Sequence, residues 1–401
     1  MALQSHTHRP ASTLSESESA TDGDPQSFPP SADLADDSVK KPGDHDPIDL
    51  KEIPPELEAI VNLINAQQSR CYYEGRFVFL KDLDADGKPP SDREWRHVYG
   101  QLVGTVFSIW EWGDLEHAAN VGPASTPSAS ASASNSPVKP TYINVADASL
   151  RLIESLPASN GSPAITNVIA LSTTFKNRFL LQFGSRSTML LWSSALRLAL
   201  FESVSLQEAY TGALLAGKGS KLNGIRLLLE ETKFKHQDWV VVRFGAGMPW
   251  TRCWAVITPA GYKKKKKNKT GHIDFFETKK AKQRKQQPLA TICAAKAVYA
   301  VYPESSLLIN NSTLLKIAGT ITVNDEALMG APRDGFIFVM PELHPGVYGF
   351  ETLIRFLIPT LDSFALYGRP QRFNADKFDI RSIMFGLPDP PSTRYLDLAD
   401  V

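Results

Sequence analysis

The chain has 401 residues, 42% of them hydrophobic and 9% aromatic, which suits two domains of ordinary size with packed cores, plus tails. Its 43 Lys and Arg residues cancel its 43 Asp and Glu residues, which argues against a polyanion partner unless the charge is unevenly distributed. No run approaches the ~18 consecutive apolar residues of a membrane-spanning helix, and the start MALQSHTHRP lacks the apolar centre of a signal peptide, so we expect cytosol or nucleus.

Residues 1–53 are predicted to be disordered. They hold eleven acidic against four basic residues, and such a segment buries too little apolar surface to offset the entropy of ordering it. We expect a regulatable tether, in which phosphorylation of Ser15, Ser17 or Ser19 adds negative charge. The tail would then compete with other anions for the basic residues of the same chain.

From residue 54 the pattern predicts a first α+β unit. A helix over 54–70 places Leu57, Ile60, Val61 and Ile64 on one face. An amphipathic helix over 188–203 ends the unit, and a low-complexity insertion, 118–140, interrupts it. Runs rich in β-branched and aromatic residues predict seven strands, at 72–84, 95–103, 105–112, 141–148, 149–155, 167–174 and 178–184.

The same order of elements then repeats. A helical linker over 205–217 leads to a second unit, closed by a helix over 346–368 that Pro359 is expected to kink or divide. Seven more strands are predicted, at 238–245, 250–258, 273–278, 289–297, 298–303, 313–323 and 335–343. We therefore expect domains at 71–204 and 235–372, joined by a linker over 205–234 and followed by an extension over 373–401.

This architecture, mainly β with α, resembles the pleckstrin-homology (PH) domain, a seven-stranded antiparallel sandwich closed by a C-terminal helix. In EGRFVFLK, Gly75 precedes an apolar run that ends in a basic residue, as in the first PH strand. The segment that starts at Trp95, WRHVY, resembles the start of the second strand. Trp192 stands where the family keeps a helix tryptophan that packs into the open end of the sandwich.

Residues 54–401 further resemble fungal tandem PH-domain proteins of the Caf/Skg type. The likeness is carried by LINAQQSRCYYEGRF, DREWRHVYGQL, QEAYTGALL, SFALYGRPQRF and LPDPPSTRYLDLADV. The resemblance implies a non-enzymatic adaptor, found at the cell cortex or bud neck or associated with the Ccr-Not complex. Because members of this family continue past this point, we expect the chain to be a fragment.

No pattern in the sequence indicates catalysis, a cofactor or a metal. GALLAGKGS, 212–220, resembles a P-loop, but Gly219 replaces the required Ser or Thr and the segment ends a helix instead of opening one. The cysteines Cys71, Cys253 and Cys293 stand far apart without a C-x-x-C pair, so we expect small buried side chains.

Local charge is nonetheless strongly uneven. Between residues 263 and 285 there are eleven Lys or Arg residues against Asp274 and Glu277. Four interpretations stay open: a solvated charge run, a nuclear import signal, RNA binding aided by Phe275 or Phe276, and binding to anionic lipid. A nuclear import signal would place part of the protein in the nucleus.

Position in the strand order distinguishes the two basic runs. The run KKAKQRK follows the third strand of its unit, where PH domains hold phosphoinositide headgroups, whereas KKKKKNK follows the second strand, at the far end. The predicted lipid-binding residues are Lys279, Lys280, Lys282, Arg284, Lys285, Arg243 and Arg252, and the predicted auxiliary cations are Lys263, Lys264, Lys265, Lys266, Lys267 and Lys269. Since the PH headgroup motif K/R-x-R is absent around Arg252, we expect weak, charge-driven binding.

The sequence therefore predicts a tandem PH-domain adaptor whose second domain contacts anionic membrane, while the first is a structural or protein-binding partner. The alternative is a protein-interaction scaffold of the Ccr-Not type without direct lipid binding. RNA is the weaker third partner, because only one of two adjacent strand residues can face outward.

Overall fold

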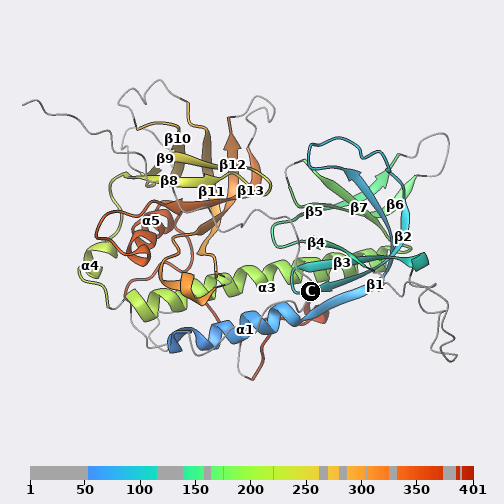
Figure 1. Ribbon diagram of the computed structural model, residues 1–401, viewed down its shortest axis with the longest axis horizontal. Helices are drawn as coiled ribbons and strands as arrows, with labels where there is room; N and C mark the ends of the chain where they lie inside the picture. Colours follow the sequence, from blue (N-terminus) through green and yellow to red (C-terminus); the bar gives the residue numbers. More distant parts are fainter. Residues whose placement is uncertain are drawn as a thin grey trace, which may run out of the picture. The chain divides into compact units, whose positions relative to one another are not determined.

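The computed structural model describes residues 53–114, 139–157, 164–174, 176–219, 221–261, 270–279, 287–303, 305–324, 332–373, 385–388 and 391–401. The N-terminal tail, most of the low-complexity insertion and the lysine run 263–269 lie outside these ranges. The described elements form two antiparallel sheets accompanied by helices (Figure 1).

The first sheet has seven strands in the order β4-β3-β2-β1-β7-β6-β5. All seven strands predicted for this unit are present: β1 (Cys71–Leu83), β2 (Arg96–Val103), β3 (Val106–Glu111), β4 (Thr141–Asn144), β5 (Ser149–Leu156), β6 (Ile165–Ser172) and β7 (Arg178–Gln182). Before it come a 3₁₀ turn, η2 (Pro55–Leu57), and α1 (Glu58–Ser69), whose buried face includes the predicted Ile60, Val61 and Ile64.

Trp192 is fully buried at the centre of the first core. Its ring contacts those of Tyr73, Phe77 and Phe107 at centroid distances of 5.1 to 5.4 Å. Aromatic pairs in such edge and tilted arrangements add to the stabilisation from burial. Gly75 pairs with Gly100 across β1 and β2, and Trp95 packs on a smaller cluster around Leu80 on the other side of the sheet.

The second sheet is a closed barrel of six strands in the order β10-β11-β12-β13-β8-β9. The strands are β8 (His236–Arg243), β9 (Trp250–Thr258), β10 (His272–Phe276), β11 (Ala290–Ala300), β12 (Leu315–Val323) and β13 (Arg333–Pro341). The prediction of seven was wrong, because the runs 289–297 and 298–303 form the single strand β11. This strand pairs with β12 along its whole length and absorbs two irregularities in register.

α5 (Gly349–Phe364) packs against β9, β10, β11 and β13 and closes the second core. Pro359 lies inside this helix without dividing it. The remaining short elements are α4 (Ile225–Leu228), η3 (Ser306–Asn310) and η5 (Leu398–Asp400).

α3 (Arg186–Gly219) is one unbroken helix of 34 residues, with α1 alongside it (Figure 1). The prediction of separate helices over 188–203 and 205–217 was wrong. The first half of α3 contributes Leu196 and Ala199 to the first core, and the second half contributes Tyr210 and Leu214 to the second. Since Ser and Val are only mildly unfavourable in helices, the helix continues through Val204 and Ser205 and packs against both cores.

By length and composition α3 is also the one described helix that could cross a membrane. Half of its 18-residue hydrophobic stretch is buried inside the protein, as in the core helix of a folded domain. The P-loop-like GALLAGKGS begins in its last turns, and the helix ends at Gly219. Of the three cysteines, Cys253 is buried as expected, whereas Cys71 is exposed and Cys293 is half-buried.

A buried carboxylate ties the C-terminal residues to the first unit. Glu202 on α3 is 2% exposed. It accepts hydrogen bonds from Arg70 Nη1 at 2.6 Å, from the Tyr72 hydroxyl at 2.5 Å and from the Tyr395 backbone N–H at 3.0 Å. Burial, and then the hydrogen bond to Glu202, raises the pKa of Tyr72. Three donors thus satisfy a charge that would otherwise be costly to bury.

Candidate functional site

Three aromatic side chains form one row across the outer face of the barrel. Trp239 on β8 pairs with Trp254 on β9, which pairs in turn with Phe276 on β10. The indole centroids of Trp239 and Trp254 lie 5.3 Å apart in an edge-to-face arrangement. Because side chains alternate across a strand, the neighbours Cys253 and Phe275 point into the core instead. We call Trp239, Trp254 and Phe276 the aromatic row.

Two of the predicted lipid-binding residues lie on this aromatic row. The Arg252 guanidinium carbon lies 4.0 Å from the centroid of the Trp239 ring, and Lys279 Nζ lies 4.5 Å from that of Trp254. Both distances are within the range of cation–π attraction. Glu342, which follows β13, accepts hydrogen bonds from Arg252 Nε at 2.5 Å and from Nη2 at 2.9 Å. This bidentate ion pair occupies the Nε and Nη2 edge of Arg252, which is one of the edges that could hold a phosphate.

Arg243 lies elsewhere. It pairs with Trp250 at the other end of the β8–β9 ladder, and its Nε donates to the Met248 carbonyl oxygen at 2.8 Å. Arg243 therefore stabilises the turn that connects β8 to β9.

The other predicted cations lie outside the described residues. Lys280, Lys282, Arg284 and Lys285 belong to the segment that connects β10 to β11, and Lys263 to Lys267 and Lys269 belong to the one that connects β9 to β10. Thr258 pairs with His272 at the end of β9 that leads into the lysine run. The run 279–285 therefore starts from the opposite end of β10, as the strand order predicted, and its headgroup role stays a prediction.

The sequence analysis missed the aromatic row itself and the partner Glu342. A signal for the row was available, because Trp239 and Trp254 both stand at outward positions of strands whose inward positions are Val240, Cys253 and Ala255. No local pattern pointed to Glu342, which is ninety residues from Arg252 in the chain.

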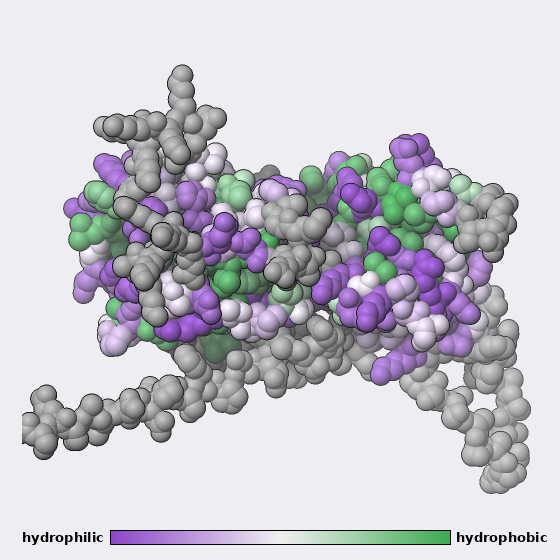
Figure 2. Space-filling model, turned by 90° about the horizontal axis from the view of Figure 1, so that it is seen from above, coloured by the Kyte–Doolittle hydropathy of each residue, from purple (hydrophilic) through white to green (hydrophobic). Residues whose placement is uncertain are grey.

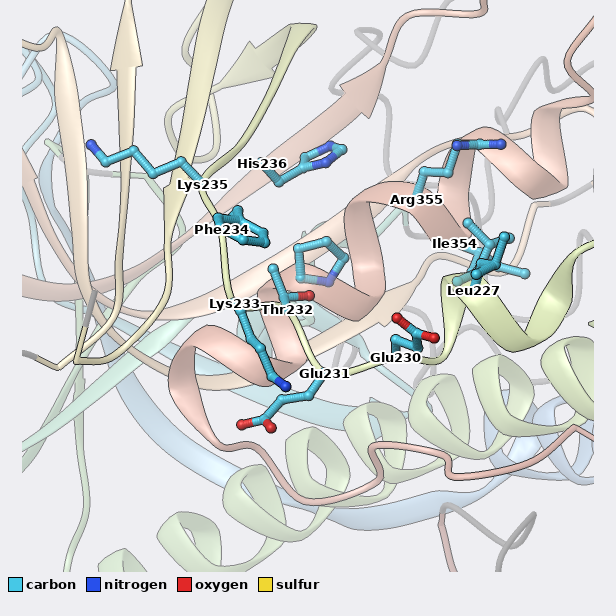
Figure 3. A pocket seen from close by; sticks show the side chains of 12 residues that line it. Leu227, Glu230, Glu231, Thr232, Lys233, Phe234, Lys235, His236, Ile354 and Arg355 are labelled. Atoms are coloured by element: carbon cyan, nitrogen blue, oxygen red, sulfur yellow. The ribbon is translucent and has the colours of Figure 1, made fainter. Parts of the chain in front are cut away.

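A cavity of about 630 Å³ lies between α5 and the segment 227–236. Figure 3 shows Phe234 and His236 on this segment, with Ile354 and Arg355 on the helix side. Burial lowers the pKa of His236, and its Nε2 has no hydrogen-bond partner among the described residues. The lining carries neither Ser nor Cys. Within the described part of the chain, no cluster of His, Cys, Asp or Glu could hold a metal ion.

Exposed apolar side chains are dispersed over the described surface. The largest exposed fractions belong to Leu227, Phe234, Tyr348 and Tyr367, all above 70%. Figure 2 shows small hydrophobic patches set among hydrophilic side chains on one face of the molecule.

Comparison with known proteins gives a family match and two curated relatives. Residues 221–385 match the family described as "Fungal PH-like domain". Over 349 residues the chain is 43% identical to "CCR4-NOT transcriptional complex subunit CAF120" of Saccharomyces cerevisiae, which covers 86% of this chain and 32% of that protein. Over 63 residues it is 46% identical to "Uncharacterized protein YJL016W" of the same species, covering 16% of this chain and 11% of that protein.

Among solved structures, the pleckstrin homology domain of ArhGAP27 aligns with 32% of this chain and 97% of its own length. The TM-score of this alignment is 0.21 and the sequence identity is 17%. The chain spans about a third of the length of CAF120. The resemblance inferred from the sequence is confirmed: residues 221–385 of this chain match the fungal PH-like domain family, and most of the chain is similar to CAF120.

Proposed function

We propose that the chain is a non-enzymatic adaptor, built from two PH-like units, that acts within an assembly of the CCR4-NOT type. The observation that carries this proposal is the 43% identity to CAF120 over 86% of this chain. The first sheet, closed by α3, and the barrel, closed by α5, support two PH-like units. The match includes 32% of CAF120, and the proposal extends to this chain the CCR4-NOT assembly named for that protein.

Co-purification tests the adaptor function. The tagged 401-residue chain is expressed in S. cerevisiae cells that lack CAF120, and the CCR4-NOT subunits recovered with it are quantified. We expect recovery well above that of a tagged unrelated protein of similar size, and unchanged recovery when Lys279 is replaced by Ala. Recovery at the level of the unrelated protein would contradict the proposal.

A second candidate function, weak binding to anionic membrane, is favoured by Lys279 on the aromatic row. Tryptophan and lysine together suit the membrane interface, where each lysine near an acidic bilayer contributes on the order of 1 kcal/mol. Localisation at the cell cortex or bud neck would follow from this function.

Vesicle sedimentation tests this second function. Changing Lys279, Lys280, Lys282, Arg284 and Lys285 to Ala should abolish sedimentation with phosphoinositide-containing vesicles at low salt. Replacing all five lysines of 263–267 by Ala removes the same number of charges. This change should weaken vesicle sedimentation only modestly and leave the lipid preference unchanged. Equal effects of the two variants would assign the binding to net charge alone.

A further inference from the structure

The C-terminal residues lie in a cleft formed by three elements of the protein. Residues 391–401 lie against the end of α1, the start of β1 and the middle of α3, and Figure 1 marks the C-terminus beside α3. They leave part of the cleft open, since a cavity of about 440 Å³ remains beside Glu202, Thr393 and Leu398. We call residues 391–401 the docked segment.

Two charged side chains of the cleft bind the backbone of the docked segment. Glu202 accepts a hydrogen bond from the Tyr395 N–H at 3.0 Å, and Arg70 Nη2 donates one to the Leu396 carbonyl oxygen at 3.0 Å. Arg70 and Glu202 also orient each other, because Arg70 Nη1 donates to the carboxylate at 2.6 Å. Every peptide has such backbone groups, so another segment that follows the same course can make both contacts.

Three side chains of the docked segment show which residues the cleft prefers. The Tyr395 ring stands edge-on to that of Phe201 on α3, with their centroids 6.0 Å apart. Asp397 forms an ion pair with Arg70 at 3.5 Å, and Leu398 packs against the first core. The preferred pattern is therefore an aromatic residue, any residue, an acidic residue and leucine.

Much of the docked segment lies at the surface. The side chains of Arg394 and Asp397 are more than half exposed and pair with each other at 2.9 Å. Exposed ion pairs of this kind contribute little to stability. Leu396 is also exposed. Segments with few buried apolar contacts open at a low cost in free energy, so an external segment of the same pattern can compete for the cleft.

We propose that this cleft is a peptide-recognition site, in which a partner protein's segment of the pattern aromatic-x-acidic-leucine exchanges with the docked segment. Glu202 and Arg70 supply an acceptor and a donor for the peptide backbone, and their own ion pair orients both before a ligand arrives. Such preorganisation reduces the entropy lost on binding. The acidic residue of the partner would meet Arg70, as Asp397 does. This inference does not depend on CCR4-NOT association.

Fluorescence anisotropy with a fluorescein-labelled peptide of residues 391–401 tests the proposal. The receptor is the 401-residue chain with Tyr395→Ala and Leu398→Ala, which weaken its own docked segment and leave Arg70 and Glu202 in place. We expect saturable binding to this double variant. Binding to the wild type should be at least about tenfold weaker, because its own segment competes at a high effective concentration.

Changes in the peptide test the pattern without altering the protein. Asp397→Ala or Leu398→Ala in the peptide should weaken its binding to the double variant several-fold. The matched control is Leu396→Ala in the peptide, which should bind as the unaltered peptide does, because the cleft contacts the carbonyl oxygen of Leu396. A peptide of the same composition in scrambled order should not bind.

Hydrogen exchange in the wild-type chain gives a readout that needs no variant. Excess peptide should raise deuterium uptake in fragments that begin before residue 391 and so differ in mass from the peptide, whereas the scrambled peptide should not. Unchanged uptake, no saturable binding to the double variant, or equal binding of the scrambled peptide would each overturn the proposal. A wild-type dimer that the peptide dissociates in analytical ultracentrifugation would assign the cleft to a second copy of this chain and overturn it as well.

Discussion

At the scale of single residues, Arg252 has two partners at the same time. It stacks on Trp239 and forms a two-pronged ion pair with Glu342. That hydrogen bond also raises the pKa of Arg252, so the guanidinium stays charged throughout the accessible pH range. A phosphate that binds the Nε and Nη2 edge of Arg252 must displace the Glu342 carboxylate.

Glu342→Gln should therefore increase sedimentation with anionic vesicles by a few-fold at low salt, because it weakens the competing carboxylate. The control Glu351→Gln removes the same charge from the exposed Glu351–Arg355 pair on α5. An equal gain in both variants would show that net charge, and not release of Arg252, controls binding.

Glu202 is the residue whose loss the fold should tolerate least. Glu202→Ala removes the buried carboxylate that pairs with Arg70, which among the described residues keeps only the exposed carboxylate of Asp397 at 3.5 Å, and it removes the acceptor of Tyr72. Loss of one partner of a buried ion pair costs about 3–5 kcal/mol. Urea unfolding followed by circular dichroism should show this loss, with Glu351→Ala, on a more exposed pair, changing the midpoint little.

At the scale of elements, α3 decides how the chain is organised. The sequence pattern predicted separate helices over 188–203 and 205–217, whereas in the structure one helix continues through Val204 and Ser205. In the same way β11 continues through the alanine-rich stretch near Ala297, where the pattern had predicted two strands. In both cases pairing or packing along the whole element outweighs a weak local preference.

Glu208 on α3 should make stability depend on pH. Burial raises its pKa from the ordinary 4.5 to about 7, so the folded state holds this proton more tightly than the unfolded state. The resulting stabilisation is present below about pH 4.5 and is lost as the pH rises through 7. Because Glu208 is partly exposed, solvent screening should reduce this stabilisation to the order of 1 kcal/mol.

Glu208→Gln removes this titration. Between pH 4.5 and 7 the unfolding free energy of the wild type should fall relative to that of the variant, as measured by urea unfolding at each pH. Parallel curves for the two proteins would show that Glu208 titrates alike in the folded and unfolded chains.

At the scale of the whole molecule, a buried ion pair joins the two sheets. Lys316 on β12 is 8% exposed and pairs with Asp147, which lies between β4 and β5. Its ammonium group also lies 4.5 Å from the Phe336 ring centroid. Burial lowers the pKa of Lys316, but Asp147 outweighs this and leaves the pKa raised, so the lysine stays charged.

Asp147→Ala should destabilise the fold by about 3 kcal/mol, because it leaves Lys316 buried and unpaired. The double variant Asp147→Ala/Lys316→Met should recover part of that loss, since an apolar side chain suits the vacated site. A double-mutant cycle by thermal unfolding measures the coupling, and additive effects of the two changes would contradict it.

Sequence alone determined the kinds of elements. The period-2 runs around Phe77 and Val240 and the helical stripe through Trp192 are local patterns, and each survives in the structure. Sequence likewise showed where the basic runs stand in the strand order.

Only the tertiary structure decided which side chains meet. Arg252 and Glu342, or Arg70, Glu202 and Tyr395, are separated by about ninety to two hundred residues. Their energies come from contacts and burial between distant segments, which no periodicity records. For the same reason the length of α3 and the six-stranded closure of the barrel depended on partners across the fold, as did the ion pair that joins Arg252 to Glu342.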